Sequence, residues 1–241
     1  MTASLLDRSL GDLARSIPGA TALFDRHQLD FCCGGEFTLR SAAGPAAAQV
    51  AAELQALQAV PDEDSRDWRK ATAEELIAHI LRRYHERHRL QLPELVRLAR
   101  RVETVHAART DCPHGLADHL QAMQQALQNH MMKEEQVLFP ALALGMAPPL
   151  RGPITVMRSE HELHGQSLQR MADLAHGLVM PPGACNTWRA LVLGLRELRE
   201  DLMQHIHLEN NVLFEGLNTP VNTGCGGGSG GGCGCGSRQP A

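Results

Sequence analysis

The sequence predicts an all-α protein in which a small helical N-terminal domain precedes an up-down four-helix bundle. Alanine and leucine dominate the chain of 241 residues, which contains only five Phe, two Trp and one Tyr. Strong helix formers of this kind fill the interior of helical bundles. Because no convincing run of alternating β-branched residues occurs, we expect no sheet. The third observation is an internal repeat of histidine and glutamate motifs in the second half.

The first 58 residues are expected to form a domain of short helices. Ser9 resembles a helix N-cap, and an apolar stripe at helical spacing follows it. Pro18-Gly19 should end this first helix, and Pro45 suits the opening turn of the last one. Between these helices, Leu29–Gly35 is expected to form an ordered turn without helical pattern. The expected helices cover about residues 9–17, 20–27, 38–43 and 45–57.

Residues 59–71 are charged and aperiodic, which indicates a linker. Thr72-Ala-Glu-Glu75 is a capping box that opens a long helix, expected to continue to about His106. Pro93 predicts either a kink or a turn boundary within it. Three further helices are expected at about 115–144, 153–176 and 186–215, with Asn186 as a cap and Gly177 and Gly216 as stops. The bundle domain would then span residues 72–217.

Two stretches of this domain repeat each other. His130 and His205 are each followed four residues later by a glutamate, and Val-Leu-Phe begins three residues after each glutamate. His85 lies 45 residues before His130, and His161 lies 44 residues before His205. Residues four apart share one face of a helix. At about 1.5 Å per residue, counting from the expected connections brings these side chains to a similar height in the bundle.

A single His-x-x-x-Glu pair is more often a surface pair or a satisfied core histidine than a metal site. Two matched pairs, each with an upstream histidine, favour a metal centre instead. Iron accepts mixed imidazole and carboxylate ligands, and inward Glu and His side chains are a known way to build a di-metal centre in a bundle. The predicted ligands are His85, His130, Glu134, His161, His205 and Glu209.

The sequence predicts less about the polar residues beside these predicted ligands. His88 and His164 come three residues after candidate ligands, so they should either support those ligands or face solvent. Other acidic neighbours are expected to be solvated or to line an access path. The solvated pair is Glu86 and Glu162, and the access-path pair is Glu135 and Glu160.

The seven cysteines form an odd set, so we expect reduced thiols rather than a disulfide framework. Adjacent cysteines rarely pair with each other because the geometry is strained. In a glycine-flanked turn, Cys32 and Cys33 therefore favour a redox or iron-transfer role over a structural one. Cys112 and Cys185 are interpreted as inert, buried structural thiols.

The last segment, 218–241, is rich in glycine and should behave as a flexible tail. Its cysteines leave two interpretations open, an inert tail or a mobile set of thiolates for a soft metal. These cysteines are Cys225, Cys233 and Cys235.

The overall composition excludes several classes of function. A net charge of −4 argues against a nucleic-acid partner, which usually requires a basic face. No run approaches the 18 apolar residues of a membrane span, so no membrane partner is expected. The N-terminus lacks a charged-then-apolar signal pattern, which favours a cytoplasmic protein.

Several of these motifs together resemble a known family, the di-iron repair-of-iron-centres proteins of the YtfE, ScdA and DnrN type. That family joins a small ScdA-N-like domain to a hemerythrin-like bundle. The likeness extends from about Ser9 to Leu217 and leaves the Cys-Gly tail outside. The matching stretches are Leu29–Gly35, Arg83–His88, His130–Glu135, Ser159–His161 and His205–Asn211.

The resemblance implies that the six predicted ligands hold two iron ions, Fe²⁺ or Fe³⁺, with Glu134 and Glu209 as carboxylate bridges. It makes Cys32 and Cys33 the functional thiols of the small domain. It further implies repair of iron–sulfur clusters damaged by nitric oxide or peroxide, as part of a stress response. Damaged or apo iron–sulfur proteins would be the partners, and a homodimer is reasonable.

Three functions therefore compete. The first is an iron donor that loads apo-clusters. The second is an enzyme that reduces nitric oxide to nitrous oxide at the di-iron centre, where six protein ligands would leave positions for small diatomic molecules. The third is a sensor or carrier of dioxygen or nitric oxide, against which the two symmetrical glutamate pairs argue, because carriers usually have a more histidine-rich set.

Overall fold

The computed structural model describes residues 4–17, 20–31, 35–58, 67–145 and 150–215. Within these ranges every regular element is helical, and a single antiparallel bridge joins Ser9 to Thr38. The predicted all-α class is therefore confirmed. The predictions for Pro18-Gly19, the cysteines at 32 and 33, Gly216 and the tail lie outside the described residues.

The N-terminal domain contains four short helices, α1 (Leu10–Ser16), α2 (Ala20–Arg26), α3 (Leu39–Ala43) and α4 (Ala47–Gln58). Ser9 caps α1 as predicted, because its Oγ accepts a hydrogen bond from the Asp12 amide at 3.2 Å. Thr38 caps α3 in the same way. Pro45 lies in a 3₁₀ turn just before α4 instead of opening that helix.

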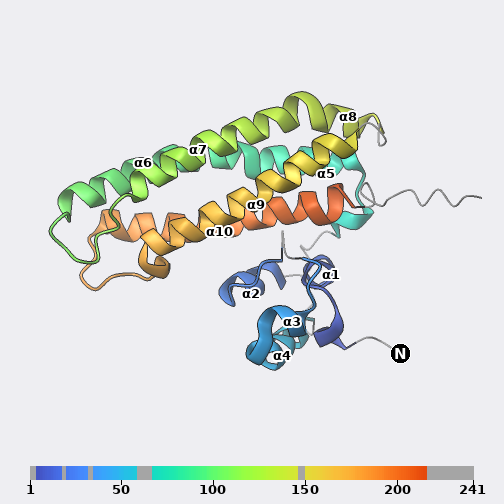
Figure 1. Ribbon diagram of the computed structural model, residues 1–241, viewed down its shortest axis with the longest axis horizontal. Coiled ribbons are helices and arrows are strands. Elements are labelled where there is room, and N and C mark those ends of the chain that lie inside the picture. Colours follow the sequence, from blue (N-terminus) through green and yellow to red (C-terminus); the bar gives the residue numbers. More distant parts are fainter. Residues whose placement is uncertain (1–3, 18–19, 32–34, 59–66, 146–149, 216–241) are drawn as a thin grey trace, which may run out of the picture.

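Four long helical segments, which we call staves, form the bundle. The first runs through α5 (Ala73–Ile80), η4 (Leu81–His85) and α6 (Glu86–Val105), and the second through α7 (Leu116–Lys133), η5 (Glu134–Leu138) and α8 (Phe139–Ala143). The third is α9 (Arg151–Leu174), and the fourth is α10 (Asn186–Leu208) followed by η8 (Glu209–Leu213). In Figure 1, α6, α7, α9 and α10 lie alongside one another, and connections at alternate ends give the expected up-down order.

Three of these staves contain a π-helical turn, which the periodicity of the sequence did not predict. His85 ends η4, while Glu134 and Glu209 begin η5 and η8. A π turn adds one residue to a helical turn and is found most often at functional sites. Here each π turn adjoins or contains a predicted ligand, so the irregular backbone lies where the site is.

The predicted helix ends agree with the structure in part. Thr72 and Glu75 form the expected capping box, and Gly177, with φ of 72°, follows the end of α9. Pro93 lies inside a continuous α6, so a turn boundary there is wrong. Pro93 is exposed, so its ring lies on the solvent side of α6. The N-cap of α10 is Cys185, with Asn186 as the first helical residue.

One cysteine prediction needs correction. Cys112 is buried, as expected, whereas Cys185 is exposed. The reason is its position at the cap of α10, where the chain leaves the loop and the side chain has not yet entered the core. Its Sγ lies 3.2 Å from Nε2 of His106, so it has a polar neighbour instead of apolar packing.

The small domain packs against the fourth stave, where α2 contacts α10 and α1 contacts η8 (Figure 1). Buried side chains of both domains belong to one continuous apolar cluster, with Phe24 and Phe31 from the small domain and Leu202 and Ile206 from α10. This contact brings the small domain beside the helix that carries two predicted ligands. Across the described ranges, no helix is both long and apolar enough for a bilayer crossing.

Candidate metal centre

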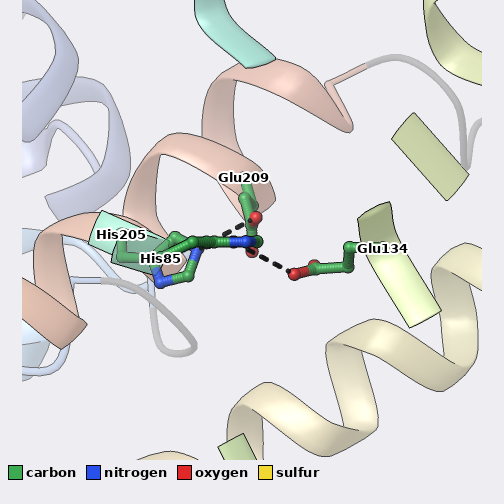
Figure 2. Close-up of side chains that lie close together, drawn as sticks. All are labelled: His85, Glu134, His205 and Glu209. Carbon is green, nitrogen blue, oxygen red and sulfur yellow. Dashed lines mark hydrogen bonds and ion pairs between the residues drawn. The ribbon is translucent and has the colours of Figure 1, made fainter. Parts of the chain in front are cut away.

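The six predicted ligands converge in the core of the bundle. Two overlapping groups form, and within each group one donor atom per residue lies within 4.8 Å of the others. All six side chains are buried, with at most 2% of any residue exposed. Figure 2 shows one group, in which the imidazole nitrogens and carboxylate oxygens face one another. The first group is His85, Glu134, His205 and Glu209, and the second is His130, Glu134, His161 and Glu209.

The distances reproduce the symmetry of the sequence repeat. Nε2 of His85 lies 3.1 Å from Nε2 of His205, and Nε2 of His130 lies 3.1 Å from Nε2 of His161. Glu209 places one oxygen 3.1 Å from His205 and the other 3.0 Å from His161. Each carboxylate therefore faces both imidazole pairs, as a bridging ligand must.

Hydrogen bonds on the far side of three rings fix their orientation. Nδ1 of His85 donates to Glu135 at 2.7 Å, and Nδ1 of His130 donates to Glu160 at 2.9 Å. Nδ1 of His161 donates to the side-chain oxygen of Asn210 at 2.8 Å. These oxygens can only accept, so each Nδ1 carries the hydrogen and each Nε2 presents a lone pair to the centre.

This donor set fits a bound cation. Two imidazole lone pairs 3.1 Å apart repel each other unless a positive charge lies between them. Both oxygens of Glu134 and one oxygen of Glu209 are buried without a hydrogen bond to any described residue. His130 does approach Glu134 at 3.2 Å, which is an ion-pair distance without hydrogen-bond geometry. Buried acceptors left unpaired are costly, and metal ions would satisfy all of them.

The pKa values of these groups also indicate that the buried site favours added positive charge. Burial lowers the pKa of His85 to about 4. Burial and the nearby charge of Glu209 both raise the pKa of Glu134. Burial opposes protonation of His130, yet the charge of Glu134, with Glu209 and Glu160, raises its pKa to about 9. Without a metal ion, a proton on His130 partly compensates the buried carboxylates.

Aromatic rings wall the centre. Phe214 stacks on His161 with 4° between the planes, and Phe139 lies 5.7 Å from His85 between ring centroids. These are the phenylalanines of the two Val-Leu-Phe repeats, which explains why that apolar triplet recurs after each glutamate. Tyr84 stacks on His205 with 1° between the planes. The rings exclude water and so strengthen electrostatic interactions within the site.

Some residues beside the predicted ligands lie in positions that the sequence analysis did not predict. His88 and His164 are buried, so a solvent-facing position is wrong for both. Glu86 and Glu162 are exposed, as expected. Glu135 and Glu160, assigned only to an access path, accept hydrogen bonds from the imidazoles of predicted ligands instead, and Asn210 was not singled out at all. Their adjacency to Glu134, His161 and Glu209 in the sequence was the signal available.

The segments on either side of the predicted thiols contact the ligand-bearing helix. The Phe31 ring meets the His207 ring edge-on at 5.5 Å, and the carbonyl of Phe31 accepts a hydrogen bond from Asn211 at 3.4 Å. Gly35 lies so close to Asn211 that an added Cβ would be 3.1 Å from the amide oxygen. His207 and Asn211 flank Glu209 by two residues on each side. Phe31 and Gly35, the described residues on either side of 32–34, thus contact the bundle within two residues of Glu209.

Comparison with known proteins agrees with both parts of the chain. A family model described as "Hemerythrin HHE cation binding domain" matches residues 76–217, and ScdA_N, a domain of unknown function, matches residues 6–60. Three similar proteins are each named iron–sulfur cluster repair protein YtfE, and each match covers 86% of this chain and 95% of the relative. They come from Pectobacterium carotovorum subsp. carotovorum (52% identical), Edwardsiella ictaluri (50%) and Yersinia pseudotuberculosis (51%).

Proposed function

This chain belongs to the YtfE family of hemerythrin-like proteins, and on that premise we propose that it repairs iron–sulfur clusters damaged by oxidative or nitrosative stress. Repair proceeds by supplying iron from two iron ions held by the six buried side chains. The observation that carries the proposal is the sharing of Glu134 and Glu209 between both groups of donors. A shared pair of carboxylates is the arrangement that holds two cations side by side.

Each ion takes two imidazoles and both carboxylates. His85 and His205 hold one ion, and His130 and His161 hold the other. When bound, the irons supply exchangeable ferrous ions and one-electron redox chemistry. The protein contributes fixed imidazoles, since Glu135, Glu160 and Asn210 hold three of the rings through Nδ1. A nitrogen and oxygen donor set of this kind also suits other divalent metals. The choice of iron therefore rests on the family resemblance.

The donor types favour release of iron to a damaged cluster. None of the six side chains is a thiolate, whereas iron–sulfur clusters are held by cysteine thiolates. Iron bound by imidazole and carboxylate can therefore move to a site with softer ligands. The direction of transfer follows from this difference in ligands, and a cytoplasmic location would keep the thiols on both sides reduced.

Cys32 and Cys33 are the proposed transfer thiols. The neighbouring residues Phe31 and Gly35 contact His207 and Asn211 next to Glu209, which supports a short path between the centre and the small domain. A pair of thiols between Phe31 and Gly35 in the sequence could accept ferrous iron and pass it to a client protein. Damaged or apo iron–sulfur proteins are therefore the proposed partners.

The test is transfer of labelled iron. The full chain is loaded anaerobically with ⁵⁷Fe²⁺ and mixed with an apo-ferredoxin, cysteine and a sulfide source, and cluster assembly is followed by absorbance and Mössbauer spectroscopy. We expect labelled clusters to form, and we expect the C32S/C33S double variant to retain iron but transfer it more slowly. Failure of the label to enter the client under reducing conditions would contradict iron supply.

A second candidate is reduction of nitric oxide. Each ion receives only four donor residues, and six-coordinate iron would keep positions for small ligands. Two ferrous ions held there would supply the two electrons that the conversion of two NO and two protons to N₂O and water requires. Headspace analysis after anaerobic addition of nitric oxide decides this point, since absence of nitrous oxide would exclude the reaction. A sensor role has no comparable support from the site.

A further inference from the structure

One ligand imidazole differs from the other three. His85, His130 and His161 each donate from Nδ1 to an oxygen of Glu135, Glu160 or Asn210. Nδ1 of His205 is buried and has no hydrogen-bond partner among the described residues. Metal-ligating histidines almost always donate their second ring N–H, because that bond fixes the ring and raises its basicity. His205 therefore requires a partner.

The sequence repeat explains why no carboxylate serves His205. His130 and His205 occupy equivalent positions in the two halves, and so do Glu160 and Tyr84, each of which immediately precedes an upstream ligand. Glu160 is the acceptor for His130. Tyr84 stands in the matching place for His205, but its ring lies flat on the imidazole with 1° between the planes. A stacked ring presents its face to the imidazole and offers the edge N–H no acceptor.

The neighbour with free hydrogen-bonding capacity is His88. Its ring centroid lies 5.4 Å from that of His205, and the residue is fully buried. Neither ring nitrogen of His88 has a hydrogen-bond partner within the described part of the chain. A neutral imidazole carries one N–H and keeps one acceptor nitrogen, so His88 can accept a hydrogen bond.

Water can reach His88 from a neighbouring cavity. His88 lines a cavity of about 160 Å³ between α6 and α7, and polar side chains form part of the cavity wall. The volume accommodates several water molecules, since each occupies about 30 Å³ in the liquid. A buried water needs two to four polar partners, and the unpaired nitrogens of His88, which lines this cavity, can be two of them. The remaining lining residues are Arg89, Leu92, Gln124, Gln128 and Met131.

We propose that His88 is a positioning residue for the metal ligand His205, which it orients through a bridging water. Nδ1–H of His205 donates to the water oxygen, and the water donates to the unprotonated nitrogen of His88. This bridge replaces the carboxylate that Glu160 provides in the other half. The inference rests on the proposed metal centre but is independent of iron supply. Any cation bound by Nε2 of His205 would leave its Nδ1–H in need of an acceptor.

The unaltered protein gives the first test. Full-length protein labelled with ¹⁵N-histidine is loaded with Zn²⁺, and exchange of the ring N–H protons with water is measured by NMR. We expect four Nδ1–H signals, with direct magnetisation transfer from water and faster exchange only at His205. Slow exchange at His205 without transfer from water would overturn the proposal, because it would require a protein acceptor.

The second test uses a matched pair of variants. His88→Leu removes the acceptor at similar volume, and His164→Leu is the control, because it is the equivalent residue of the repeat and touches His130, which already has Glu160. The rate constant of Fe²⁺ loss to a chromogenic chelator should rise about ten- to hundredfold in H88L. It should stay close to the wild-type value in H164L and recover partly in H88Q.

The outcomes separate this inference from the proposed function. If wild-type protein binds two metal ions but H88L and H164L lose iron at equal rates, the positioning role fails and the centre stands. If wild-type protein binds no metal pair, the centre itself fails. Circular dichroism of each variant shows whether it folds, and the NMR measurement needs no variant at all.

Discussion

Asn211 holds the small domain against the bundle, and its replacement by alanine should loosen that contact measurably. Its amide donates to the carbonyl of Phe31 and to Nδ1 of His207, at 3.4 and 3.1 Å. A hydrogen bond contributes about 0.5–1.5 kcal/mol net, and a buried acceptor left unpaired costs more. His207 is only 2% exposed, so the sum is about 2–3 kcal/mol. The docking equilibrium should therefore fall about thirty- to a hundred-and-fiftyfold.

Hydrogen exchange measured by mass spectrometry reports this change directly. Amides near Phe31 should exchange faster in N211A by the same factor, because opening of the contact exposes them. Iron content should match the wild type, since Asn211 is not one of the six proposed ligands. The rate of iron transfer to an apo-ferredoxin should fall along with the protection.

Glu215→Ala provides the matched control. Glu215 forms a rim ion pair with Arg15 at 3.4 Å, and its side chain is 53% exposed. Such pairs contribute about 0–1 kcal/mol, so exchange should change less than about fivefold. Equal effects of N211A and E215A, or unchanged protection near Phe31 in N211A, would refute the reasoning that Asn211 holds Phe31 against the bundle.

Three further predictions concern the centre and its support. Glu134→Gln removes an anionic ligand from both ions, so mass spectrometry should find fewer than two metals per chain. In metal-free protein, burial lowers the pKa of His85 to about 4 and of His164 to about 3. The unfolded chain therefore binds more protons below about pH 6.5, and urea midpoints should fall from pH 7 to pH 5. Gly35→Ala places a Cβ 2.8 Å from the carbonyl of Phe31 and should lower the free energy of unfolding by about 1–3 kcal/mol in urea titrations. Unchanged metal content, a pH-independent midpoint, or a fully stable G35A protein would each contradict the corresponding prediction.

Much of the fold could be predicted because local signals agreed with one another. Ser9, Thr72 and Glu75 are capping residues whose hydrogen bonds depend on near neighbours alone. The π turns gave no such signal, because hydrophobic periodicity averages over several turns and hides one added residue. Cys185 was assigned to the core because single cysteines usually lie buried in apolar helices, whereas its place at a helix cap depends on where the preceding loop ends.

That these six side chains converge could be predicted because the repeat preserved spacing within each helix. Their supporting partners could not be predicted in the same way, since Glu135 reaches His85 across 50 residues and Asn210 reaches His161 across 49. Which oxygen meets which ring depends on how the four staves are rotated about their axes. Adjacency in sequence identified Glu135 and Glu160 as neighbours of the site without revealing that they hold its rings.

The most direct test of the account is the metal content and magnetic state of the purified protein. Anaerobic loading with ⁵⁷Fe, removal of excess iron and Mössbauer spectroscopy should give two irons per chain. Oxidation should couple the two spins, because shared Glu134 and Glu209 bring the ions together. One iron per chain, or two irons with independent magnetic spectra, would contradict a carboxylate-bridged pair.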